Sequence, residues 1–204
     1  MNIKKISIQK KNDFEKKLKL INSIFNINQN LPNQVFKKVF SDFVFEEFDW
    51  TMSTEFWDSC LKPLALSSQD SHILVAVLNP DPVNYFYQTF GYYNWLNIPT
   101  NTTGNDYWNA LKTSPKDNPA DSILFNSEIV AWIPTSGKWA IWGDRSYGIC
   151  ILAFADEQTQ SSSISLTKTW KPIDKALKHF IAVNFKNQKI PQDIIDSFIL
   201  NYAK

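Results

Sequence analysis

The chain has 204 residues, of which 44% are hydrophobic and 20% charged, a balance that is typical of a folded globular protein and excludes a disordered one. A chain of this length buries roughly 70% of the surface that its unfolded form exposes, so a stable core needs no disulfides or metal. The net charge is +1, but residues 1–20 and 165–204 are rich in lysine and residues 21–164 are acidic. Because the aromatic-rich middle is acidic, the sequence argues against nucleic-acid binding.

The cysteines and the N-terminal residues favour a cytoplasmic protein. Cys60 and Cys150 are far apart and form no disulfide framework, so we expect two free thiols in a reducing compartment. The lysine-rich N-terminal stretch is not followed by the apolar run of a signal peptide. Apolar runs such as residues 73–78 are far shorter than the ~20 residues that a membrane-spanning helix needs. We therefore expect no membrane association.

The first third of the chain predicts mainly helices. Apolar residues at helical spacing predict an amphipathic helix over residues 14–25, and a second short helix is expected over residues 35–40. Phe43 and Phe45 fit either a strand or a continuation of that helix. Residues 54–61 fit a further helical turn before Pro63.

The middle of the chain alternates between strands and helices. Residues 72–78 (HILVAVL) are apolar on both alternating faces, which predicts an interior strand. The elements expected next are a turn over residues 79–82, a short helix over 83–90, a short strand over 92–98 and a helix over 105–111.

Three consecutive strands give the clearest signal, over residues 128–133, 138–142 and 147–154. Their connections, residues 134–137 and 143–146, are short and therefore require antiparallel pairing. The third strand is apolar on both faces and is expected to be central in the sheet.

The C-terminal part is expected to complete one domain. Residues 158–165 are polar and predict a surface loop, and Pro172 and Pro191 each open a helix. Two helices alone make a poor domain, so we expect them to pack on the sheet. The sequence thus predicts a single globular domain over residues 1–204 with an α+β fold, a small, mainly antiparallel sheet with helices packed against it.

The sequence contains no catalytic motif. His72 and His179 have no metal-ligand partners at the required spacings, and Ser136-Gly137-Lys138 lacks the rest of a phosphate-binding loop. Cys60 lies in no catalytic signature, and Cys150 lies inside an apolar strand, so a Cys–His nucleophile pair is not supported. We expect no enzyme activity, no cofactor and no metal.

Two segments carry the candidate binding residues. Arg145 is the only arginine in the chain and follows two tryptophans, and Trp, Tyr and Arg dominate the energetics of protein interfaces. Residues 42–58 contain six acids and no lysine, which would attract a basic partner. The predicted partner-binding residues are Trp139, Trp142, Asp144, Arg145, Tyr147, Glu46, Glu47, Asp49 and Asp58. The alternative is that Asp144 and Arg145 form a local ion pair, that the tryptophans pack in the core and that the acids are a solvated face.

The segment over residues 129–154 (IVAWIPTSGKWAIWGDRSYGICILAF) resembles the sheet segment of small bacterial immunity proteins from polymorphic toxin systems. This resemblance covers about an eighth of the chain and rests on a Trp-bearing hairpin, a short polar turn and an apolar strand. It implies a cytoplasmic, non-enzymatic inhibitor that binds one toxin domain. The acidic segment over residues 42–58 suggests that this toxin domain is basic.

Two other functions remain open from the sequence. One is a small-molecule-binding domain or enzyme whose pocket is lined by aromatic residues such as Tyr92, Trp95, Tyr107 and Trp108. The other is a structural component of a prophage or another assembly. The identity of the partner and the oligomeric state cannot be derived from these residues.

Overall fold

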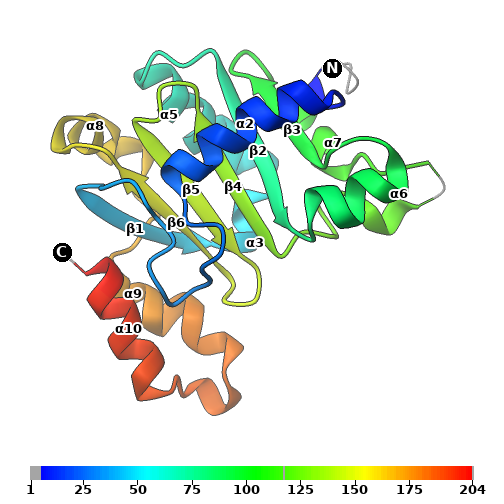
Figure 1. The fold of residues 1–204 in the computed structure, drawn as a ribbon. Coiled ribbons are helices and arrows are strands. Elements are labelled where there is room, and N and C mark those ends of the chain that lie inside the picture. Colours follow the sequence, from blue (N-terminus) through cyan, green and yellow to red (C-terminus); the bar gives the residue numbers. More distant parts are fainter. Residues whose placement is uncertain (1–5, 117, 204) are drawn as a thin grey trace.

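The computed structural model describes residues 6–116 and 118–203 and shows an α+β fold, as predicted (Figure 1). Its centre is a six-stranded antiparallel sheet with the strand order β1-β6-β5-β4-β2-β3. The strands are β1 (Asp42–Glu47), β2 (His72–Asn79), β3 (Trp95–Pro99), β4 (Ile129–Pro134), β5 (Trp139–Asp144) and β6 (Ile149–Phe154).

Short helices fill most of the connections between the strands. The α-helices are α2 (Lys11–Ile24), α3 (Phe48–Thr51), α4 (Thr54–Phe56), α5 (Lys62–Ser67), α6 (Gln88–Phe90), α7 (Gly104–Lys112), α8 (Glu157–Ser163), α9 (Ile173–Ala176) and α10 (Gln192–Tyr202). Three segments are π-helical: η1 (Trp57–Leu61), η2 (Pro82–Tyr87) and η5 (Leu177–Ile181). The 3-10 turns are η3 (Pro119–Asp121), η4 (Ile164–Leu166), η6 (Ala182–Asn184) and η7 (Lys186–Gln188).

The strand predictions from the apolar patterns are confirmed. The three consecutive strands β4, β5 and β6 pair antiparallel through short turns, and β2 lies inside the sheet between β4 and β3. The ambiguous segment around Phe43 and Phe45 forms β1, which pairs with β6 although more than a hundred residues separate the two in the chain. The predicted central position of β6 is thereby confirmed.

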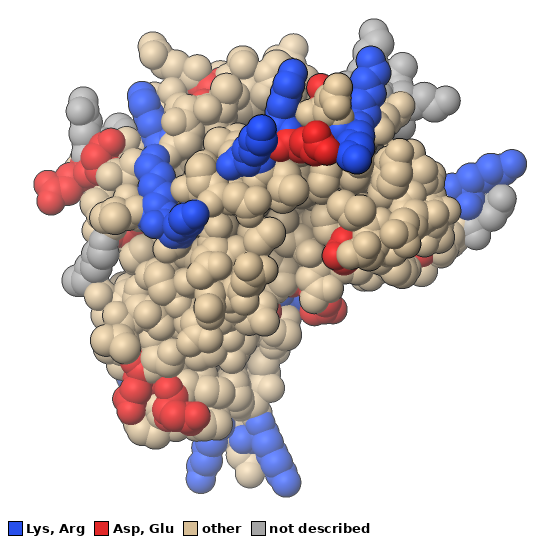
Figure 2. All heavy atoms as spheres, in the orientation of Figure 1, with Lys and Arg blue, Asp and Glu red and all other residues tan. Residues whose placement is uncertain are grey.

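Both faces of the sheet are buried, and each has its own core. Alternate residues of every strand point to opposite sides. One core packs against α2, α9 and α10 and contains Phe45 and Trp142, and the other packs against α3–α5 and α7 and contains Trp132 and Trp139. Figure 1 shows α2 crossing one face and α10 lying at the lower edge of the molecule. In Figure 2, lysine side chains gather over α2, as its amphipathic sequence predicts, and acidic side chains lie near the lower end of α10.

Both edge strands are covered by other parts of the chain. At the β3 edge, the N–H of Ile8 donates to the carbonyl of Trp95 at 3.0 Å. At the β1 edge, Phe45 and Lys171 exchange two backbone hydrogen bonds of 2.8 Å each. Exposed strand edges pair with other chains, so these short bridges protect the sheet from edge-to-edge association.

Two predictions about local structure were wrong. The expected helix over residues 35–40 is an irregular segment, because the N–H groups of Lys37 and Lys38 donate to the carbonyl of Ile24 at the end of α2. Its Phe36 and Phe40 are nevertheless buried. The expected loop over residues 158–165 contains α8 and η4, and the side chain of Asp156 accepts a hydrogen bond from the N–H of Thr159 at 2.7 Å, which caps the first turn.

A buried aspartate fastens the β4–β5 turn to the end of α5. The Asp70 carboxylate, in a residue only 5% exposed, accepts hydrogen bonds from the N–H and hydroxyl of Ser136 at 2.5 and 2.8 Å. It also accepts one from Ser68, whose oxygen in turn accepts the indole N–H of Trp139 at 3.1 Å. These bonds join the end of α5 to the β4–β5 hairpin, two segments that are distant in the chain.

We predict that Asp70→Ala lowers the free energy of unfolding by about 2–3 kcal/mol, because the Ser136 N–H and the Ser68 hydroxyl lose the buried carboxylate to which they donate. Chemical denaturation at neutral pH measures this change. The matched control is Asp196→Ala, which removes an exposed aspartate on α10 and should change stability by about 0.5 kcal/mol or less. An Asp70→Ala variant as stable as this control would contradict the assignment.

Candidate functional site

The structure buries both tryptophans that the sequence analysis placed at a partner interface. Trp139 is 0% exposed and Trp142 is 1% exposed, and they lie in the cores on opposite faces of the sheet. Residues three apart in a strand necessarily point to opposite faces. These indoles are core residues, and the expectation that they contact a partner is corrected.

Two other predicted binding residues, Asp144 and Tyr147, also serve the fold. Asp144 is 2% exposed, and its carboxylate accepts hydrogen bonds from the Ser146 hydroxyl at 2.6 Å and the Tyr147 N–H at 3.2 Å. Burial raises the pKa of the Asp144 carboxyl. The ring of Tyr147 lies edge-on to Phe198 of α10, with centroids 5.4 Å apart. Asp144 and Tyr147 therefore hold the β5–β6 turn and α10 in place.

The acidic segment divides between buried and exposed carboxylates. Glu46 is 6% exposed and points into the core that contains Cys60 and Cys150, and burial raises its pKa above the ordinary value. Its Oε2 atom has no hydrogen-bond partner in the part of the chain that the structure describes. Asp58 is exposed, but its Oδ1 accepts the N–H of Gly104 at 3.0 Å, at the first residue of α7. Glu47 and Asp49 are exposed to solvent.

Arg145 is a clamp between loops. Its Nε donates to the carbonyl of Ser127 at 2.7 Å, and its Nη2 donates to the carbonyl of Leu124 at 3.0 Å and to the hydroxyl of Ser127 at 3.3 Å. Its Nη1 pairs with Asp49 at 3.3 Å, and its Cζ lies 4.6 Å from the centre of the Phe48 ring. The alternative considered for Arg145, a local ion pair with Asp144, does not form, because the Asp144 carboxylate is bonded to Ser146 and Tyr147 within its own turn.

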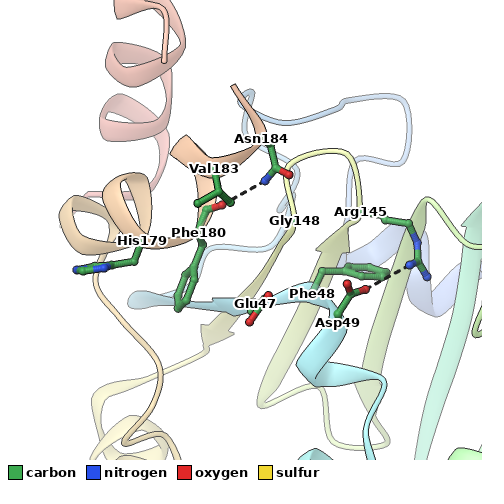
Figure 3. A pocket seen from close by; sticks show the side chains of 9 residues that line it. All are labelled: Glu47, Phe48, Asp49, Arg145, Gly148, His179, Phe180, Val183 and Asn184. Carbon is green, nitrogen blue, oxygen red and sulfur yellow. Dashed lines mark hydrogen bonds and ion pairs between the residues drawn. The ribbon is translucent and has the colours of Figure 1, made fainter. Parts of the chain in front are cut away.

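Arg145, Glu47 and Asp49 meet at a cleft of about 490 Å³ (Figure 3). One wall carries His179, Phe180 and Val183 from η5 and η6, and the other carries Phe48, Asp49 and Arg145. Glu47 lies between the two walls at the end of β1, and Asn184 and Gly148 complete the lining. The structure thus brings together three of the nine predicted residues.

The local sequence explains how the two walls are held together. The side-chain amide of Asn184 donates to the carbonyl of Tyr147 at 2.9 Å and to that of Phe180 at 3.2 Å. Gly148 has a φ of +67°, and a Cβ there would lie 2.7 Å from Asn184 Nδ2, so a side chain at this position would break the contact. The π-helical turn η5 presents His179 and Phe180, and such turns often occur at functional sites.

The hydrogen-bonding groups that remain available in the cleft are mostly acceptors. No hydrogen bond or ion pair joins the Glu47 side chain to the residues that the structure describes, and the Asp49 side chain is 79% exposed. Asn184 uses its amide N–H₂ for the fold, which leaves its oxygen unused within the described chain. The Arg145 guanidinium, by contrast, is largely consumed by the bonds that hold it.

The second wall of the cleft, formed by residues 179–184, has no signal in the sequence. Phe180 fits the apolar stripe of the helix that Pro172 opens, and from the sequence His179 is a candidate only for a metal ligand or the partner of a cysteine nucleophile. No local signal places residues 179–184 opposite residues 47–49, because the contact depends on how the C-terminal helices pack on β1. The Asn184–Gly148 pairing likewise joins segments that no sequence spacing connects.

The alternative pocket of aromatic residues does not form. Trp95 and Tyr107 are both fully buried and lie in the cores on opposite faces of the sheet. Trp108 lies beside the Lys112 ammonium, whose nitrogen is 4.8 Å from the ring centre. These rings cannot line one common cavity.

Other reactive groups give no second site. Over residues 6–116 and 118–203, no group of three or more His, Cys, Asp or Glu side chains could hold a metal ion. Burial raises the pKa of the Cys60 thiol to about 12 and also raises that of Cys150, so both thiols are poor nucleophiles. The same described residues contain no helix with the length and apolar character needed to cross a bilayer.

Comparison with known proteins gives no family assignment. No protein-family model, no curated protein and no solved structure matches the chain. The function must therefore be inferred from the cleft itself.

We predict that Trp139→Phe destabilises the protein by about 1 kcal/mol more than Trp142→Phe. Both changes remove similar volume from the same buried strand, but only the Trp139 indole N–H has a partner, whereas that of Trp142 has none among the described residues. Equilibrium denaturation of the two variants measures the difference. Equal losses would mean that the bond to Ser68 contributes nothing.

We predict that Glu46→Gln stabilises the protein at pH 7. The pKa of Glu46 is raised in the folded state by burial, so folding becomes less favourable as pH rises from the ordinary carboxyl pKa of 4.5 through the raised value. The gain should therefore vanish below pH 4.5, where the carboxyl is neutral in both states. Denaturation across this pH range tests it, with the exposed neighbour Glu47→Gln as the control; a gain independent of pH would contradict the prediction.

Proposed function

We propose that this protein is a non-enzymatic inhibitor of the immunity type, which binds and neutralises a basic toxin domain in the cytoplasm. The observation that carries the proposal is the pair of exposed carboxylates, Glu47 and Asp49, at the rim of an open cleft between two fixed walls. Exposed charges at an interface speed the encounter with an oppositely charged partner and discriminate against other partners. The resemblance of residues 129–154 to immunity proteins supports the same class.

The placement of these residues suits recognition of a protein. Glu47 ends β1 and Asp49 lies in α3, so both side chains are presented by regular elements that pack on the sheet. A binding site on such elements changes little when a partner docks, which limits the entropic cost of association. The burial of Trp139 and Trp142 does not weaken this proposal, because these side chains stabilise the sheet that supports the cleft.

A small-molecule-binding role is the second candidate, and the size of the cleft favours it. Ligand sites have volumes of roughly 300–1,000 Å³, and this cleft of about 490 Å³ lies within that range. However, such sites bury most of the ligand in a mainly apolar cavity, whereas this cleft is lined by several charged side chains. Turnover of a small substrate by the purified protein would favour this role over the inhibitor.

The test of the inhibitor proposal starts from the gene that lies immediately upstream. We predict that its product arrests growth, that this chain restores growth when both are produced, and that the two purified proteins associate. Glu47→Lys combined with Asp49→Lys should slow association by about tenfold or more at low salt, because two attractive charges become repulsive.

The matched control is Glu55→Lys combined with Asp174→Lys, which reverses two exposed acids that do not line the cleft. Both double variants should first be shown to be folded by denaturation. Association rates measured at several salt concentrations distinguish long-range electrostatic attraction, which salt weakens, from direct contacts in the complex. An equal effect of the two double variants would contradict a role for the cleft, and an upstream product that is harmless or is not restrained by this chain would contradict the immunity assignment.

A further inference from the structure

We propose that the anchor recognised by the cleft is the guanidinium group of an arginine side chain of the partner. This inference rests on the proposed function and names the chemistry of the residue that enters the site. Three features of the cleft support it: its unused acceptors, its aromatic walls and the internal use of its own arginine.

The first feature is the surplus of acceptors. Glu47 offers two carboxylate oxygens with no partner among residues 6–116 and 118–203, and Asn184 offers its amide oxygen to the same cleft. Asp49 uses one oxygen for Arg145 and leaves the other exposed. A guanidinium group carries only donors, so it can satisfy these oxygens without leaving an acceptor of its own unpaired.

The second feature is that an aromatic ring lines each wall of the cleft, Phe48 on one side and Phe180 on the other. The guanidinium of Arg145 lies over Phe48, and the nitrogen of Lys171 lies 5.6 Å from the centre of the Phe180 ring. Phe180 is only partly buried and lines the opposite wall, so part of its ring surface faces the cleft. A planar cation stacks on such a ring and gains further when water is excluded.

The third feature argues against an anion and favours arginine over lysine. Arg145 cannot easily serve an incoming carboxylate or phosphate, because its Nε and Nη2 donate to Ser127 and Leu124 and its Nη1 pairs with Asp49. A planar guanidinium can donate two parallel hydrogen bonds to one carboxylate while it stacks on a ring, whereas an ammonium acts as a point charge. Glu47 and Phe180 together match the planar group.

The test uses the whole chain and three small compounds: Nα-acetyl-arginine amide, Nα-acetyl-lysine amide and Nα-acetyl-citrulline amide. Citrulline keeps the shape of arginine without its charge. Titration followed by two-dimensional NMR should shift the backbone amide of Gly148 and the side-chain amide of Asn184 with the arginine compound, more weakly with lysine and not with citrulline. Glu47→Gln should weaken arginine binding by about tenfold, whereas Glu55→Gln, outside the cleft, should leave it unchanged.

A second variant tests the contribution of the Phe180 ring to arginine binding. Phe180→Leu keeps an apolar side chain in the wall and removes the ring, and it should weaken arginine binding by about two- to fivefold. Equal shifts with citrulline and arginine, or unchanged binding in Glu47→Gln, would overturn the proposal. If the toxin partner binds Glu47→Gln as tightly as the unaltered chain, the arginine anchor is wrong and the inhibitor function still stands. If the arginine compound binds but no protein partner exists, the inhibitor function is wrong and the arginine site still stands.

Discussion

Burial of both faces of one sheet is the constraint on which the rest of this structure depends. Every residue of β4, β5 and β6 is buried, because helices or irregular segments cover the two sides. The side chains of these three strands are therefore not exposed to a partner or a substrate. Exposed polar chemistry is confined to strand ends and to the segments that join them, and the cleft lies where β1 ends, beside the β5–β6 turn and the C-terminal helical segment.

Arg145 shows how the fold determines what this cleft can bind. A lone arginine next to aromatic residues fits a binding hot spot, yet here its guanidinium secures the loop around Ser127 and covers Phe48. An arginine is suited to this task because several donors in one plane can reach several carbonyls at once. Once those donors are committed, the cleft retains acceptors and ring surfaces, and its chemistry changes from anion binding to cation binding.

The fold could be predicted from the sequence wherever burial on both faces left continuous apolar runs, as in β2 and β6. Local patterns failed where distant backbone groups decided the outcome. Residues 35–40 have helical spacing, but the end of α2 takes their N–H groups; residues 157–163 are polar, but Asp156 caps them into a helix. Of the candidate site, Glu47, Asp49 and Arg145 could be found from charge and composition. His179, Phe180 and Asn184 could not, because tertiary packing alone brings them to β1.

The distribution of acids explains why the negative charge of the middle segment acts locally. Glu46, Asp70, Asp121 and Asp144 are buried within the fold, so a docking partner does not contact their carboxyl groups. The count of acids in the sequence therefore overstates the acidic surface. Since exposed charges are screened beyond about 10 Å at 0.1 M salt, a partner senses chiefly the carboxylates that it approaches directly. Glu47 and Asp49 occupy such a position, because the cleft between two clamped walls brings a docking side chain within that distance of both.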